Sequence, residues 1–137
     1  VDTVEQIPLE SVIGDAFVVE TKGILRAKEA EDILRRACSE GRDSEKRILL
    51  KGDGEISLPA AEVFAEKGIL LIGTEKTSVG QADAPMAVHK TFLEKKVVIL
   101  EGLRLGDVSE GVYFLNAAPL CLSGFDGAPC RAVLIEH

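Results

Sequence analysis

The chain has 137 residues and a formal net charge of −7, with an isoelectric point near 4.9. This length is typical of one domain, and 46% hydrophobic with 28% charged residues is typical of a globular protein, not a disordered one. An acidic chain lacks the clustered Lys and Arg that bind phosphate backbones, so no nucleic-acid partner is expected. No apolar run approaches the roughly 20 residues of a membrane span, so no membrane association is expected either.

The basic and sulfur-containing residues give no sign of a special environment. The most basic stretch, residues 35–47, is interleaved with Glu and Asp and is interpreted as a solvated helix and loop. Three cysteines, Cys38, Cys121 and Cys130, are an odd number for a disulfide framework, and there is no CxxC pair. The first residues do not have the pattern of a secretory signal. A reduced, cytoplasmic protein is therefore expected.

Strand and helix patterns alternate over the first hundred residues. Strands are predicted at residues 15–20, 47–51, 69–73 and 97–103. Helices are predicted at 27–40, at 58–67 behind Ser57 as a capping residue, and at 84–95. Short strands follow at 112–116, 119–122 and 130–136. The pattern predicts the α/β class, with a parallel sheet covered by helices on both faces and antiparallel strands in the C-terminal third.

Common catalytic and phosphate-binding motifs are missing from the chain. It contains no GxxxxGK[ST], GxGxxG, GxSxG or HExxH. The Lys76-Thr77 pair lacks the glycine that a phosphate loop needs before its lysine. Because the other histidine is the C-terminal His137, any histidine chemistry would depend on His89.

His89 and Glu101 form the most informative pair of polar residues. The predicted helix around His89 has one apolar stripe, made of Met86, His89, Phe92 and Leu93. His89 is therefore expected to face the sheet. Glu101 lies in the next strand, where a buried carboxylate would need a partner, and a short turn would let the two side chains meet.

Three interpretations of this pair stay open. It can be structural, either as a hydrogen bond or as two groups that each reach solvent separately. It can also be two metal ligands pointing into one cavity, although metal sites need three or four ligands. It can also serve general acid–base catalysis without a metal.

Several segments carry a family resemblance. They are GILLIGTEKTSVG (68–80), His89 followed twelve residues later by Glu101 in ILEGLRLGDV (99–108), GVYFLNAAPL (111–120) and GFDGAPCRAVLIE (124–136). Together they resemble the cyclase family of metal-dependent hydrolases, which includes bacterial kynurenine formamidase and isatin hydrolase. Residues 4–20 are similar to the family segment that follows its first metal motif.

The resemblance implies a swivelling β/β/α fold, a dimer or tetramer, and hydrolysis of amide or lactam bonds with divalent metal, often zinc or manganese. His89 and Glu101 match the downstream pair of the family's metal ligands. The first metal motif, His-x-Gly-Thr-His-x-Asp-x-Pro, has no counterpart, since no His precedes residue 89. We therefore expect a single cyclase-like domain over residues 1–137, truncated at the N-terminus and corresponding to the C-terminal two-thirds of the family fold.

The functional expectation follows from the resemblance. The chain is expected to be a truncated kynurenine formamidase-like protein, from a family that hydrolyses small amides such as N-formylkynurenine. As an isolated chain it should be inactive, hold no tightly bound zinc or manganese and have no assigned catalytic residue. Glu75, Asp83 or a neighbouring subunit's carboxylate could complete the site. The expected partners are further copies of the chain and a small aromatic amide. The alternative is a non-catalytic small-molecule-binding or oligomeric module derived from the same family.

Overall fold

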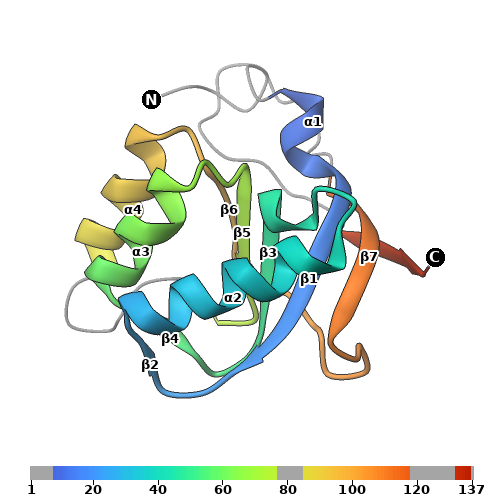
Figure 1. The fold of residues 1–137 in the computed structure, drawn as a ribbon, viewed down its shortest axis with the longest axis horizontal. Coiled ribbons are helices and arrows are strands. Elements are labelled where there is room, and N and C mark those ends of the chain that lie inside the picture. The colour runs from blue at the N-terminus through green and yellow to red at the C-terminus, as the bar shows by residue number, and fades with distance from the viewer. Residues whose placement is uncertain (1–7, 77–84, 118–131, 137) are drawn as a thin grey trace.

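The computed structural model describes residues 8–76, 85–117 and 132–136, and it has an α/β architecture (Figure 1). Its main sheet has six strands in the order β6-β5-β3-β1-β7-β8. These strands are β1 (Ile13–Thr21), β3 (Arg47–Gly52), β5 (Leu71–Thr74), β6 (Val98–Leu100), β7 (Gly111–Asn116) and β8 (Val133–Glu136). The predicted strands at 15–20, 47–51, 69–73, 97–103, 112–116 and 130–136 thus have counterparts, whereas the one predicted at 119–122 lies outside the described residues.

The sheet is parallel in one half and antiparallel in the other. The strands β1, β3, β5 and β6 pair in parallel, while β7 pairs antiparallel with β1 and β8 antiparallel with β7. The connecting helices are α2 (Ala27–Glu40), α3 (Leu58–Glu66) and α4 (Pro85–Glu94). The predicted mixture of parallel and antiparallel strands is therefore confirmed.

All three connecting helices pack on the same face of the sheet. Their buried residues belong to one core cluster, which also includes Phe17, Ile48 and Ile72 from the strands (Figure 1). The expectation of helices on both faces is wrong. The strands β3, β5 and β6 follow β1 in one direction across the sheet. Right-handed crossovers that all run in one direction place every connecting helix on the same face.

The other face has a second apolar cluster without a helical layer. Val18, Leu49, Leu71 and Leu115 belong to it. The four-residue helix α1 (Leu9–Val12) and the segment 101–110, through Leu105, supply its cover. A two-stranded parallel sheet of β2 (Ile24–Leu25) and β4 (Glu55–Ile56) and a short 3-10 helix, η2 (Ser44–Lys46), complete the described elements. These pieces are too short to produce a periodic sequence pattern.

The helix α2 has the predicted bounds, but α4 faces the core differently from the prediction. In α4 the buried side chains are Val88 and Phe92, while Met86 and Leu93 are exposed. The stripe that was expected to face the sheet is therefore rotated, because α4 packs against both α3 and β6. His89 consequently lies at the border between the buried and exposed sides of the helix.

Arg47 is buried, which corrects the interpretation of residues 35–47 as wholly solvated. Its guanidinium donates hydrogen bonds to the backbone carbonyls of Glu10 and Asp15, and so ties β3 to the segment around α1. Burial lowers the pKa of the Arg47 guanidinium below its ordinary value. Within the described ranges, none of the helices is long and apolar enough to cross a membrane.

Ser57 caps α3 as predicted, and its removal should destabilise the fold. Its hydroxyl accepts a hydrogen bond from the Ala60 amide at 3.3 Å and donates one to the Leu25 carbonyl at 2.6 Å. We expect Ser57→Ala to lower the free energy of unfolding by about 1 to 2 kcal/mol in urea denaturation. The control is Ser39→Ala, at an exposed serine near the end of α2, which should change it by less than about 0.5 kcal/mol. Equal effects of the two substitutions would contradict the capping role.

Candidate metal centre

A tight turn brings the candidate ligands together. The helix α4 ends at Glu94, and the amides of Lys96 and Val97 donate to the carbonyls of Leu93 and Phe92 at 3.0 and 2.9 Å. Lys96 has a positive φ of 59°, the left-handed conformation that commonly ends a helix. The chain therefore reverses at once into β6, which returns alongside α4.

His89 and Glu101 are in direct contact. His89 lies one turn into α4, and Glu101 directly follows the last residue of β6. The imidazole Nε2 is 3.0 Å from the carboxylate Oε2. The side chains are 28% and 31% exposed, so both are partly open to water. The prediction that the two side chains meet is thus confirmed, although His89 is not turned fully away from solvent.

The pair has the donor types and spacing of two ligands of one cation. Zinc binds imidazole nitrogen at about 2.0–2.1 Å and carboxylate oxygen at about 2.0–2.2 Å, so two ligand atoms of one ion lie no more than roughly 4.3 Å apart. The observed 3.0 Å satisfies that limit. In residues 8–76, 85–117 and 132–136, no group of three or more His, Cys, Asp and Glu side chains could hold a metal ion. Within these residues, His89 and Glu101 could therefore supply only part of a metal site.

The backbone after Glu101 is fastened to the end of β5. The Gly102 amide donates to the Lys76 carbonyl at 2.8 Å, and the Leu103 amide donates to the Thr74 carbonyl at 3.0 Å. These bonds continue the β5–β6 pairing beyond the last residue of β6. Because Glu101 is held between a paired strand and this paired segment, its backbone position is well determined.

Gly73 lets Leu103, which follows Glu101, pack closely against β5. A Cβ atom at this position would lie 2.6 Å from the Leu49 Cδ2 and 2.7 Å from the Leu103 Cδ1. Any side chain there would force the ends of the Leu49 and Leu103 side chains to move. The glycine in the buried run 69–73 therefore has a packing role next to the candidate centre.

Glu75 also fixes the position of the segment 101–110, through the side chain of a residue just after β5. Its Oε1 accepts a hydrogen bond from the Gly52 amide at 2.8 Å, and its Oε2 accepts one from the Leu105 amide at 2.9 Å. The same carboxylate therefore joins the ends of β3 and β5 to the chain after Glu101. Lys51 adds a further tie, since its ammonium donates to the Val108 carbonyl at 2.6 Å.

These contacts change the part expected of Glu75. Both of its carboxylate oxygens accept backbone hydrogen bonds, so in this structure it holds the chain in place, and among the described residues it forms no three-ligand group with His89 and Glu101. Its amide partners are 23 and 30 residues away in sequence, too far for a local pattern to reveal. Asp83, the other candidate from this region, lies outside the described residues.

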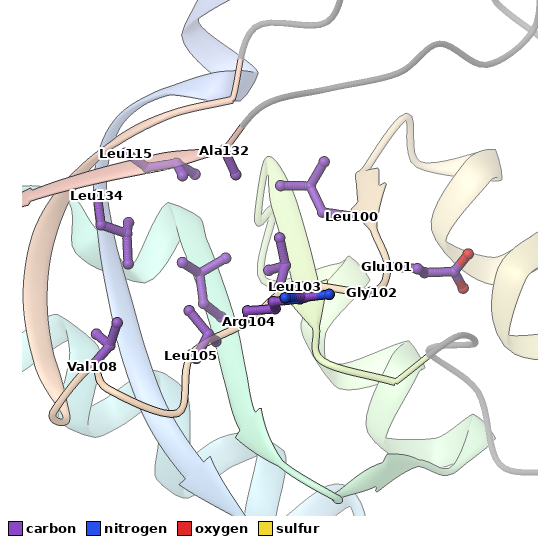
Figure 2. Close-up of a pocket in the computed structure, with 11 residues that line it drawn as sticks. Leu100, Glu101, Gly102, Leu103, Arg104, Leu105, Val108, Leu115, Ala132 and Leu134 are labelled. Carbon is purple, nitrogen blue, oxygen red and sulfur yellow. The ribbon is translucent and has the colours of Figure 1, made fainter.

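A cavity of about 510 Å³ lies on the sheet face opposite α2, α3 and α4. Its apolar lining includes Leu49, Leu100, Leu103, Leu105, Leu115 and Leu134. Figure 2 shows the Glu101 side chain pointing away from these leucines and toward α4. Leu100 and Glu101 face opposite sides because successive residues of a strand do so. Glu101 is nevertheless one of the residues that line this cavity, and the expectation that His89 and Glu101 point into one cavity stays a prediction.

Comparisons with known proteins give this geometry a context. The chain is 36% identical over 135 residues to a kynurenine formamidase of Erythrobacter litoralis, in a match that covers 93% of the chain and 62% of that relative. A solved structure described as a potential metal-dependent hydrolase with cyclase activity superposes with a TM-score of 0.80 at 30% identity. That superposition covers 97% of this chain and 70% of the other. No family profile matches the chain.

A third comparison concerns the fold alone. An isatin hydrolase, solved with a product analogue, superposes with a TM-score of 0.75 at 18% identity, covering 98% of this chain and 64% of the other. With a mixed central sheet and helices on one face, the chain has the α/β fold of the cyclase-like hydrolases. It belongs to the cyclase-like family of metal-dependent hydrolases, which includes the kynurenine formamidases. It spans 62% of the length of the Erythrobacter relative, which is less than two thirds.

The role of Glu75 can be tested by replacing one of its oxygens. In Glu75→Gln an NH₂ group would face one of the two backbone amides, so we expect a loss of about 1 to 3 kcal/mol of unfolding free energy. We also expect faster hydrogen exchange at the Gly52 or Leu105 amide. The control is Glu66→Gln, at an exposed carboxylate in the last turn of α3, which should leave both properties unchanged. Unchanged exchange at both amides in Glu75→Gln would contradict the proposed contacts.

Proposed function

We propose that this chain carries part of the active site of a hydrolase that cleaves small linear amides, of the type of N-formylkynurenine. The supporting observation is the His89–Glu101 contact of 3.0 Å in a chain that is similar to a named kynurenine formamidase. Because these relatives are named as hydrolases, the comparisons do not favour the alternative of a non-catalytic binding module.

In this proposal His89 and Glu101 are two ligands of a divalent cation. When bound, such a cation lowers the pKa of a coordinated water molecule and polarises the amide carbonyl. Imidazole nitrogen with carboxylate oxygen is a donor pair that suits zinc and manganese. The chain's own contribution is to hold these two donors on rigid elements, with α4 positioning the imidazole and the fastened end of β6 positioning the carboxylate.

Two ligands alone hold a cation weakly, since catalytic zinc sites use three protein ligands. We therefore propose that the 137 residues by themselves bind zinc or manganese only weakly and do not hydrolyse amides measurably. The remaining ligands would come from further polypeptide or from a second subunit. The substrate of the completed site would be a small aromatic amide.

We also propose a cytoplasmic location. Cys38 is free and exposed, and a free thiol is what a reducing compartment favours. Cys121 and Cys130 lie outside the described residues.

Metal titration tests the ligand assignment. After dialysis the chain should retain far less than one equivalent of zinc or manganese by elemental analysis. In calorimetric titration with ZnCl₂ it should show weak binding that is lost in both His89→Ala and Glu101→Gln. Glu94→Gln, a change of another carboxylate in the last turn of α4, is the matched control and should leave that weak binding intact.

Two results would contradict this part of the account. Weak binding that persists unchanged in His89→Ala and Glu101→Gln would show that the pair does not bind the metal. One tightly held equivalent, lost in both variants, would show that the chain itself assembles a complete site.

A fusion tests the activity. The part of the Erythrobacter litoralis kynurenine formamidase that the match leaves out can be joined to this chain. We expect the fusion to hydrolyse N-formylkynurenine, and we expect Glu101→Gln in it to reduce the rate by at least about a hundredfold, because a metal ligand is lost. Glu94→Gln in the fusion should retain full activity. A folded fusion that retains metal through His89 and Glu101, yet leaves N-formylkynurenine unchanged, would overturn the substrate proposal.

A further inference from the structure

The last residue of β5 and the two residues after it bind the chain that follows Glu101. Residues 74–76 accept hydrogen bonds from the backbone amides of residues 102, 103 and 105, at distances of 2.8 to 3.0 Å. Two of these bonds end on backbone carbonyls, which almost any sequence supplies. The bond from the Leu105 amide ends on the Glu75 side chain, so this contact depends on the identity of residue 75.

The backbone directly after Glu101 contains a flexible joint. Gly102 has a positive φ of 74°, and a Cβ atom at this position would meet nothing within 4 Å. Glycine has access to more backbone conformations than any other residue. The strand β6 before it has three residues and, within the described part of the chain, pairs with β5 alone. The position of Glu101 therefore depends on bonds that the chain makes after the joint.

Glu75 makes such a bond from a well-fixed base. Its other oxygen accepts a hydrogen bond from the Gly52 amide at 2.8 Å, at the end of β3. Gly52 pairs with Thr21 of β1, and a Cβ atom at position 52 would lie 2.5 Å from the Thr21 carbonyl oxygen. The Glu75 carboxylate thus connects the interior strands β1 and β3 to Leu105, three residues beyond the joint at Gly102.

We propose that Glu75 is a positioning residue for Glu101. By holding Leu105, it keeps the Glu101 carboxylate where it can bind the same cation as His89. This inference rests on the proposed function, because it concerns the affinity of that pair for a divalent cation. In this role Glu75 does not bind the cation itself, and its effect passes through the backbone of residues 102–105.

Both the length and the chemistry of the Glu75 side chain matter for this role. Its two oxygens accept hydrogen bonds from two different segments, 23 and 30 residues away in sequence. An Asp side chain is shorter by one methylene group, about 1.5 Å, and would reach only one of the two amides. A Gln side chain has the right length but turns an NH₂ donor toward one amide donor. Each replacement therefore loses one bond and leaves Glu101 itself unaltered.

A zinc titration observed at the histidine ring measures the effect on the metal pair. The full chain, isotope-labelled, is titrated with ZnCl₂ at constant pH while the imidazole resonances are recorded. The chain has only two histidines, so the His89 signals are readily assigned, and they give a dissociation constant even for weak binding. Residues that orient metal ligands directly contribute roughly tenfold to a hundredfold in affinity. Because Glu75 acts through the backbone, we expect the dissociation constant to rise at least about threefold in Glu75→Gln and in Glu75→Asp.

The control is a variant that loses stability elsewhere. Ser57→Ala removes the cap of α3, and the Ser57 hydroxyl bonds to Leu25 and Ala60, not to the segment after Glu101. This variant should leave the zinc dissociation constant measured at His89 unchanged. Equal weakening of zinc binding in Ser57→Ala and Glu75→Gln would show a general effect of lost stability and would overturn the proposal.

Hydrogen exchange in the metal-free chain tests the positioning itself. In Glu75→Gln the amides of Gly102 and Leu103 should exchange at least about fivefold faster than in the unmodified chain, because local opening at the joint becomes easier. In Ser57→Ala the same two amides should keep their rates. Unchanged exchange at both amides in Glu75→Gln would contradict the positioning role.

The outcomes separate this inference from the proposed function. If zinc binds at His89 with the same affinity in the unmodified chain and in both Glu75 variants, the positioning role is overturned while the proposed function stands. If zinc leaves the His89 signals of the unmodified chain unchanged, the proposed function fails, and the effect on metal affinity inferred for Glu75 fails with it.

Discussion

The parallel pairing of β5 with β6 determines where the candidate metal ligands lie. The pairing continues through backbone bonds from Gly102 and Leu103 to the end of β5, so Glu101 is held between two fixed segments. Gly73 permits this approach because a side chain there would collide with Leu103. With the carboxylate anchored, the tight turn after α4 is what brings His89 to 3.0 Å from it. The centre thus results mainly from backbone geometry, which suits a site whose ligands must be preorganised.

The one-sided sheet has consequences for both faces. Crossovers in a single direction place α2, α3 and α4 on one face and give the parallel strands one deep core there. The opposite face keeps a layer of leucines under α1 and the segment 101–110, with a cavity of about 510 Å³. Glu75 and Lys51 hold that segment down through backbone amides and a carbonyl. At the edge of the sheet, β8 exposes the apolar side chains of Val133 and Ile135.

Local sequence patterns predicted the bounds of the helices and strands well, but predicted less well which of their side chains are buried. The 3.6-residue spacing in 27–40 and the stop at Gly41 predicted α2 to the residue, and the hydroxyl of Ser57 predicted the start of α3. The orientation of α4 was missed, because Met86 and Leu93 fit an apolar stripe as well as Val88 does, and only packing against α3 and β6 decides between them. Arg47 was missed for a similar reason, since its carbonyl partners are 32 and 37 residues away.

The sequence was enough to predict that His89 and Glu101 meet, but not which residues and surfaces surround them. A helix, a short turn and a strand place His89 and Glu101 within reach of each other, which local geometry can establish. That the Glu101 side chain points toward α4 depends on which face of β6 the helices cover, a property of the whole topology. The part of Glu75 depends on amides from two distant segments, and no local motif records that.

Paramagnetic broadening by Mn²⁺ tests the central claim most directly, because it locates even a weakly bound ion. With substoichiometric MnCl₂ added to isotope-labelled chain, the account predicts that amide resonances around His89 and Glu101 broaden first. It also predicts that this local broadening disappears in Glu101→Gln. Broadening centred on another acidic surface, or broadening around residues 89 and 101 that persists in Glu101→Gln, would contradict the assignment of this pair as metal ligands.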